Sequence, residues 1–119
     1  MNVIEQDSWA TSPGLWNGIW EGGAHGAPIT VIFHSSEGSG HGPKLHTHPY
    51  SETFIIQTGR ALFVIGDQQH EAVAGQILIC PAGVPHKYTN LGPRLLEAVN
   101  IHANGTSIIE RLRPIPATR

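Results

Sequence analysis

Residues 40–59 read GHGPKLHTHPYSETFIIQTG, and this segment carries the most informative spacing in the chain. His46 and His48 are two residues apart, and Glu52 follows four residues after His48. Side chains at positions i and i+2 of a β-strand lie on the same face, so an extended segment would bring both imidazoles together. The Pro49-Tyr50-Ser51 tripeptide predicts a turn, after which Glu52 would open a neighbouring strand and meet them.

Two imidazoles and a carboxylate that converge in this way predict a divalent-metal site, because transition metals in proteins bind these groups. A histidine pair alone would be weak evidence, but a second pattern lies farther along the chain. Residues 40–59 follow G-x5-H-x-H-x3-E-x6-G, and residues 75–90 follow G-x5-P-x-G-x2-H-x3-N. Fifteen residues separate the two segments.

These two segments, at this separation, resemble the two sequence motifs of the cupin superfamily. The resemblance covers roughly residues 29–102, which is most of the chain. It implies an all-β fold, the double-stranded β-helix or jelly-roll barrel. It also implies that His86, from the second motif, joins His46, His48 and Glu52 as the fourth ligand of one divalent transition metal ion per chain.

Runs of β-branched and apolar residues between turns that contain glycine or proline predict short strands over this range. An edge strand is expected at 15–21. The barrel strands are expected at 29–35, 44–48, 53–56, 61–65, 68–73, 77–80, 86–89 and 95–102. Gly66-Asp67 predicts the two-residue turn of a β-hairpin between two of them.

A chain of 119 residues is long enough for a single domain with its own core. We expect an N-terminal extension at 1–28, the barrel at about 29–102, and a helix and tail at 103–119. Ser107-x-x-Glu110 has the form of a capping box, so we expect a short C-terminal helix. Its apolar face would consist of Ile108, Ile109 and Leu112.

Charged residues make up 13% of the chain, against about 25% in an average protein. So few charges predict that another subunit covers part of the surface, and we expect a homodimer. The net charge of −2 gives no reason to expect nucleic acid or an anionic membrane as a partner. No apolar run approaches the ~20 residues of a membrane span.

The single cysteine, Cys80, excludes an intrachain disulfide, which favours the cytoplasm. It lies in an apolar segment, so we expect packing rather than nucleophilic chemistry. All three tryptophans, Trp9, Trp16 and Trp20, precede the motifs. We expect them to pack on the outside of the barrel or against a second subunit, and an aromatic lid over the pocket is the alternative.

Period-two alternation also predicts the wall of a pocket. If Glu52 and His86 point inward, Phe54 and Tyr88 share their faces and would line the open side of the metal. The alternative is that Phe54 and Tyr88 only fill the barrel interior. His41, in the glycine-rich loop before the ligands, and His102, near a strand end, are further lining candidates. The catalytic residues remain unknown.

Three neutral imidazoles and one carboxylate would give a divalent ion a local charge of about +1 and leave two positions of an octahedron open. Open positions predict an enzyme that acts on a small molecule, similar to the metal-dependent cupin dioxygenases, isomerases and lyases, with a dioxygenase favoured. A non-catalytic metal- or metabolite-binding cupin is the alternative. Ligand type does not discriminate among Fe, Mn, Ni, Co, Zn and Cu.

Overall fold

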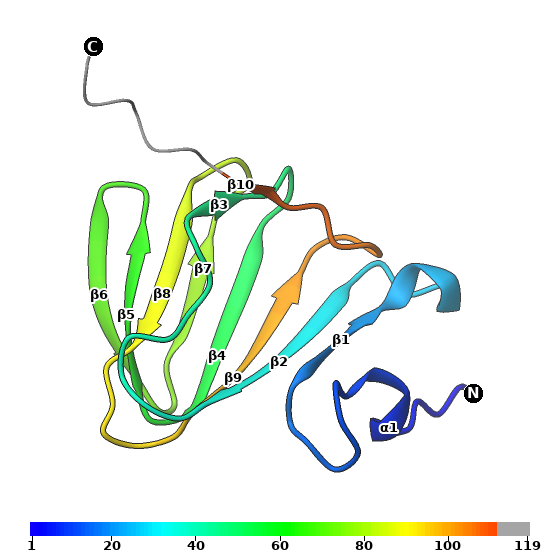
Figure 1. Cartoon of the computed structure of the whole chain (residues 1–119). Helices are drawn as coiled ribbons and strands as arrows, with labels where there is room; N and C mark the ends of the chain where they lie inside the picture. Colours follow the sequence, from blue (N-terminus) through cyan, green and yellow to red (C-terminus); the bar gives the residue numbers. More distant parts are fainter. Residues whose placement is uncertain (112–119) are drawn as a thin grey trace.

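Two antiparallel sheets of five strands pack face to face in the computed structural model, which describes residues 1–111 (Figure 1). The first sheet has the order β1 (Gly18–Glu21), β2 (Thr30–Ser36), β9 (Leu96–His102), β4 (Glu52–Thr58) and β7 (Ile77–Cys80). The second has the order β10 (Glu110–Arg111), β3 (His46–Thr47), β8 (His86–Asn90), β5 (Arg60–Ile65) and β6 (Gln68–Val73). The expected jelly roll is confirmed.

Each barrel strand expected from the sequence is present, with ends that differ by a few residues. The predicted hairpin is confirmed, since β5 and β6 pair in register on either side of Gly66-Asp67. The edge strand is shorter than expected and begins at Gly18. Before it lies the short helix α1 (Gln6–Trp9), and after it the 3-10 helix η1 (Gly22–His25). No helix within residues 1–111 has the length and apolar character needed to cross a membrane.

The predicted C-terminal helix is wrong in the described part of the chain. Residues 107–109 have no regular structure, and Glu110–Arg111 pairs with His46–Thr47 as strand β10. The backbone of Ile108 bonds to side chains of the turn between β3 and β4 instead of to a helical turn: its N–H donates to the Tyr50 hydroxyl, and its carbonyl accepts from His48. These bonds over a long sequence distance outweigh the local capping signal. Leu112, expected on the helix, lies outside the described residues.

The three tryptophans pack on the outer face of the first sheet. Trp9 stacks on Phe33 with ring centroids 3.7 Å apart, and Trp16 meets the same ring edge-on at 4.9 Å. The strand neighbours of Phe33, Ile32 and His34, line the internal cavity, so Phe33 points to the opposite face. The prediction of outside packing is therefore confirmed, and the alternative of a lid over the pocket is wrong.

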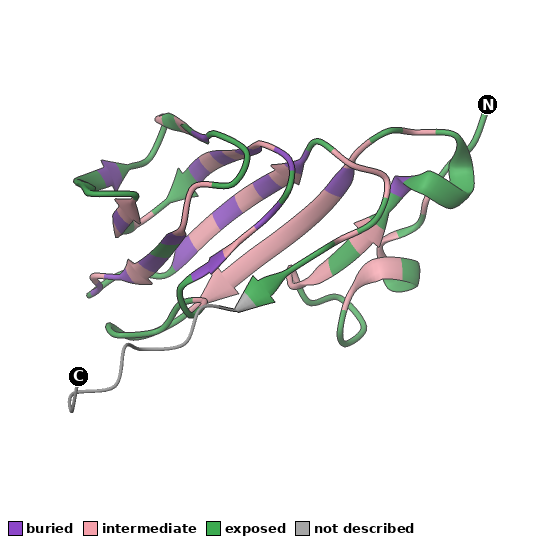
Figure 2. Ribbon diagram, turned by 90° about the horizontal axis from the view of Figure 1, so that it is seen from above, coloured by how far each residue is buried: buried purple, intermediate pink, exposed green. Residues whose placement is uncertain are grey.

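The space between the sheets contains an apolar core at one end and a polar cluster at the other. Burial alternates along the strands, as the banding in Figure 2 shows. The apolar part includes Phe54, Ile56, Phe63 and Leu96, each at most 2% exposed. Successive inward positions of β4 run from Glu52 through Phe54 to Ile56, so one strand spans both parts.

The glycine-rich loop before β3 lies tightly along β8. Gly40 N–H donates to the Asn90 carbonyl, and Asn90 N–H donates to the His41 carbonyl. A Cβ atom on Gly42 would collide with the carbonyl oxygen of Tyr88, so only glycine allows this approach. The next residue of the loop, Pro43, lies in the wall of the cavity.

Candidate metal centre and cavity

Strand register brings the four motif residues together at the polar end of the sandwich. In the second sheet, His46 of β3 pairs directly with His86 of β8. In the first sheet, Glu52 opens β4 and faces them from the opposite layer. His48 follows β3 at the start of the turn that leads to Glu52. One ligand atom from each of His46, His48, Glu52 and His86 lies within 4.8 Å of the others, and all four residues are buried.

The three histidines share one hydrogen-bonding arrangement. Each has its Nδ1 atom against a backbone carbonyl: His46 against Lys44 at 2.6 Å, His48 against Ile108 at 2.7 Å, and His86 against Val84 at 3.0 Å. A carbonyl oxygen only accepts, so each Nδ1 carries the hydrogen and each neutral imidazole presents a lone pair at Nε2. This is the tautomer and the outer support that metal-binding histidines have.

The Nε2 atoms of the three histidines gather around the Glu52 carboxylate, and no positively charged side chain of residues 1–111 lies between them. Glu52 Oε1 lies 3.0 Å from both His48 Nε2 and His86 Nε2, and of these two contacts the one to His86 has the geometry of a hydrogen bond. His48 Nε2 is buried and has no well-aligned hydrogen bond to any described residue. Electron-pair donors packed this closely repel one another unless a positive charge lies between them. A divalent ion satisfies all four groups at once.

The electrostatics of the cluster favour a bound positive charge. Burial alone would raise the pKa of Glu52, but the neighbouring His102, His48 and His86 outweigh it and hold that pKa well below its ordinary value. Burial lowers the pKa of His46, so this imidazole is neutral and able to bind a metal. Burial also acts to lower the pKa of His48, yet contacts with Glu52 and Ile108 raise it overall. A proton and a metal ion would compete for this anionic centre.

The size of the cluster suits a transition metal. Ligand bonds of about 2.1 Å place neighbouring ligands of an octahedron ~3 Å apart and opposite ligands ~4.2 Å apart. The separations in the cluster, 3.0 Å for the closest pairs and 4.8 Å at most, are close to this range. Small side-chain movements would complete the coordination.

His102 forms a second layer around the carboxylate, through a contact that sequence reasoning did not reveal. Its register partner is Glu52, and its Nε2 lies 3.1 Å from Glu52 Oε2. On the other side, its Nδ1 lies 2.6 Å from the Tyr50 hydroxyl, which is 3.3 Å from the Ile108 carbonyl. The single hydroxyl hydrogen therefore goes to His102 Nδ1, the nearer acceptor, and the imidazole hydrogen stays on Nε2, near Glu52 Oε2 but without a well-aligned hydrogen bond to it.

Cys80 lies behind His86, as a packing residue would. Its side chain is 1% exposed, and Sγ lies 3.3 Å from His86 Nδ1 and 3.4 Å from the Val84 carbonyl. Burial raises the pKa of Cys80 to about 11, so the group stays a thiol at neutral pH. The thiol supports the orientation of the imidazole and is not a nucleophile.

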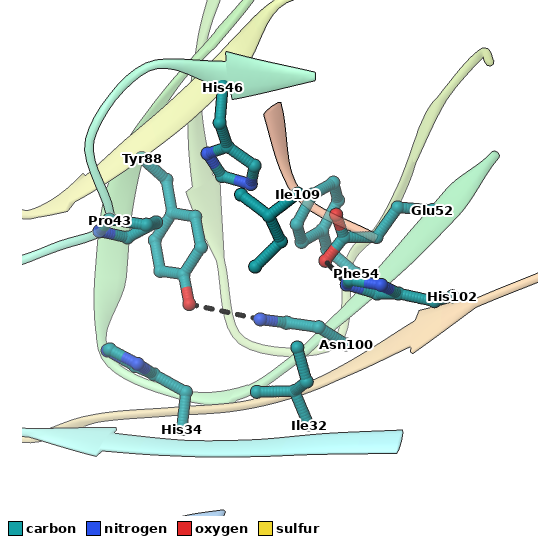
Figure 3. Close-up of a pocket in the computed structure, with 10 residues that line it drawn as sticks. All are labelled: Ile32, His34, Pro43, His46, Glu52, Phe54, Tyr88, Asn100, His102 and Ile109. Atoms are coloured by element: carbon teal, nitrogen blue, oxygen red, sulfur yellow. Dashed lines mark hydrogen bonds and ion pairs between the residues drawn. The ribbon is translucent and has the colours of Figure 1, made fainter. Parts of the chain in front are cut away.

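A cavity of about 300 Å³ opens beside the cluster (Figure 3). Phe54, Tyr88 and His102 line it, and Phe54 and Tyr88 also belong to the apolar core. His41 does not belong to the lining: its side chain is exposed, and the loop uses its carbonyl to hold Asn90. Asn100, which the sequence did not single out, lies between these walls on β9.

The comparisons with known proteins agree with this geometry. A family model described as "Cupin domain" matches residues 32–102, more than half of the chain. The chain belongs to the cupin family. Both cupin motifs fall within the matched range, and so do all four residues of the cluster. No curated protein matches this cupin.

Several solved structures have a similar fold. An uncharacterised protein from Klebsiella pneumoniae with a double-stranded β-helix domain is 20% identical, with a TM-score of 0.70, and the match covers 96% of this chain and 99% of that one. A conserved protein of unknown function from Streptococcus pyogenes is 18% identical, with a TM-score of 0.58 and 68% of each chain covered. Identities this low show the fold alone.

A variant of oxalate decarboxylase from Bacillus subtilis also matches, at 19% identity and a TM-score of 0.71. The match covers 80% of this cupin but only 27% of that enzyme. The chain thus corresponds to about one quarter of the larger protein, and the similarity again concerns the fold.

Proposed function

We propose that this cupin binds one divalent transition metal ion through His46, His48, Glu52 and His86 and acts as an enzyme on a small molecule. The observation that carries the proposal is the convergence of three Nε2 lone pairs on a buried carboxylate, directly beside a cavity. A structural site is closed by its ligands, whereas a catalytic site keeps a side open to substrate. His46 and Glu52 line the cavity, so the open side would face it.

When bound, such an ion would supply Lewis-acid chemistry or, if redox-active, oxygen chemistry. The residues of this chain would hold it, orient the substrate and exclude water. Phe54, Ile32 and Ile109 give the cavity apolar walls, and the buried Glu52 contributes the one negative charge. Among these chemistries a dioxygenase is our first choice, because an ion held by four protein ligands would keep positions open for a small substrate and oxygen.

The first prediction is that the purified protein contains one divalent ion per chain and consumes oxygen with a small chelating substrate. Metal analysis by mass spectrometry, followed by oxygen-electrode screening with catechols, flavonoids and thiols, measures both. A metal-free protein after exposure to each of the six candidate metals would refute the site. A metal-filled protein that is inert towards oxygen and other substrates would support the alternative, a non-catalytic metal- or metabolite-binding cupin.

The outer face of the first sheet supports the predicted homodimer. Register places mostly apolar residues in two rows across its strands. One row consists of Trp20, Val31, Ile101, Thr53 and Ile79, and the other of Phe33, Val99, Ile55 and Ile77. Ile77 and Ile79, on the edge strand β7, are 62% and 65% exposed. The two rows contain no charged residue, although Glu97 follows on the same face of β9, and a largely apolar face of this kind is complementary to itself, as a two-fold interface requires.

The second prediction is a dimer at micromolar concentration that dissociates when this face becomes charged. Ile77→Lys combined with Ile79→Lys should convert the dimer to a monomer, because the interface would bury two unpaired ammonium groups per chain. Light scattering gives the mass, and Gln69→Lys, on the exposed side of β6, is the matched control. A wild-type monomer would contradict the dimer.

A location in the cytoplasm also remains a prediction.

A further inference from the structure

The cavity has a second polar end, away from the candidate metal centre. Figure 3 shows the Tyr88 hydroxyl and the Asn100 amide between the side chains of the centre and those of His34 and Ile32. Asn100 Nδ2 donates to the Tyr88 hydroxyl oxygen at 3.0 Å. Both side chains are nearly buried, at 4% exposure for Tyr88 and 3% for Asn100.

The Tyr88 hydroxyl hydrogen and the Asn100 Oδ1 atom each lack a hydrogen-bond partner among the described residues. The Tyr88 oxygen accepts from Asn100, so its own hydrogen is free for another acceptor. Asn100 Oδ1 is buried and has no partner among the described residues. A buried amide or hydroxyl with half of its capacity unused costs free energy, which a ligand with matching groups would recover. Burial raises the pKa of Tyr88 well above its ordinary value, so the hydroxyl keeps its hydrogen at neutral pH.

The second polar end is also uncharged. No lysine or arginine of the described chain lines the cavity, and its one carboxylate, Glu52, belongs to the metal centre. Burial lowers the pKa of His34, so this side chain is neutral too. An anionic or cationic group at this end would lose its hydration without gaining a counter-charge. The cavity therefore discriminates against a charged tail.

The volume and walls restrict the ligand further. A volume of about 300 Å³ lies at the small end of ligand pockets and corresponds to about ten water molecules. Phe54 lies on one side, and the Tyr88 ring is flanked by the edge of His34, with ring centroids 5.2 Å apart. Phe54 and Tyr88 contact each other edge to face, with ring centroids 5.9 Å apart, so a flat, apolar middle section of a ligand would lie against this shared wall.

Building on the proposed metal site, we propose that Tyr88 and Asn100 form a specificity subsite for the tail of the substrate. The substrate class is a compact neutral molecule that binds the metal through a chelating group at one end. At its other end it has an uncharged hydroxyl or amide, which accepts from the Tyr88 hydroxyl and donates to Asn100 Oδ1. Tyr88 and Asn100 select this tail and do not bind the metal.

The test uses the full chain loaded with Co²⁺ and three benzohydroxamic acids that share one chelating head. Their para substituents are ethyl, hydroxymethyl and carboxylate, and the first two have nearly equal size. Changes in the visible absorption of the cobalt ion give each dissociation constant. One added hydrogen bond predicts that the hydroxymethyl compound binds about fivefold more tightly than the ethyl compound. The carboxylate compound should bind at least about tenfold more weakly than the hydroxymethyl compound.

The preference for hydroxymethyl over ethyl should disappear in Tyr88→Phe and in Asn100→Leu. Thr58→Val, which removes an exposed hydroxyl bonded to Glu97 outside the cavity, should retain it. Equal binding of ethyl and hydroxymethyl compounds to the wild type, or tightest binding of the carboxylate, would overturn the subsite while leaving the metal site intact. Failure of Co²⁺ itself to bind would overturn the proposed metal site, and the subsite with it.

Discussion

Replacing His86 by alanine is expected to lower metal affinity by more than about a hundredfold while the barrel stays folded. Loss of an outer hydrogen bond around a metal site already costs about 10–100-fold, and this substitution removes a ligand itself. His86 lies at the border of the apolar part of the interior, whose own contacts, such as Phe54 against Phe63, remain in the variant, so the core should survive. Mass-spectrometric metal analysis after dialysis gives the affinity, and circular dichroism checks the fold.

His70→Ala is the matched control, because His70 is exposed on β6 and only contacts Gln76 there. It should bind metal as the wild type does. Full metal content in the His86→Ala variant would show that the fourth ligand has been assigned to the wrong residue, and His102 would then be the first replacement to consider.

Replacing Tyr50 by phenylalanine is expected to lower metal affinity about 10–100-fold without removing any ligand. The Tyr50 hydroxyl accepts from Ile108 N–H at 2.9 Å and lies 2.6 Å from His102 Nδ1. Without it, His102 loses the hydroxyl that holds its Nδ1, and with it the support for an imidazole whose Nε2 lies 3.1 Å from Glu52 Oε2. The Ile108 backbone, whose carbonyl orients His48, also loses the hydrogen bond from its N–H to the Tyr50 hydroxyl. Competition with a chelating dye measures the change.

Tyr88→Phe is the control for this result, since it deletes the other tyrosine hydroxyl of the chain from the opposite end of the cavity. Its metal affinity should equal that of the wild type. An unchanged affinity in Tyr50→Phe would mean that the second layer around Glu52 does not support the metal, and a loss of similar size in both variants would indicate a general effect of weakened packing.

Much of the fold and the four-residue cluster could be predicted from the sequence because these features depend on local order. Strand positions follow from β-branched runs and turn residues. The shared face of His46 and His48, and of Glu52 and Phe54, follows from the two-residue period of a strand. The resemblance of the two motifs to those of the cupins then implied that His86 would join them, and the structure brings all four residues together.

Only the tertiary structure decided which distant segments support that cluster. His102 meets Glu52 because β9 pairs with β4, a register that no local pattern specifies. Tyr50, which the sequence marked only as a turn residue, reaches His102 and Ile108, more than fifty positions away. Residues 107–109 stay irregular and Glu110–Arg111 forms a strand, because the backbone of this segment bonds to the turn and to β3, and these bonds outweigh a capping signal that acts over three residues. Periodicity tells which face a residue occupies, whereas sheet pairing and backbone bonds between remote segments decide what that face meets.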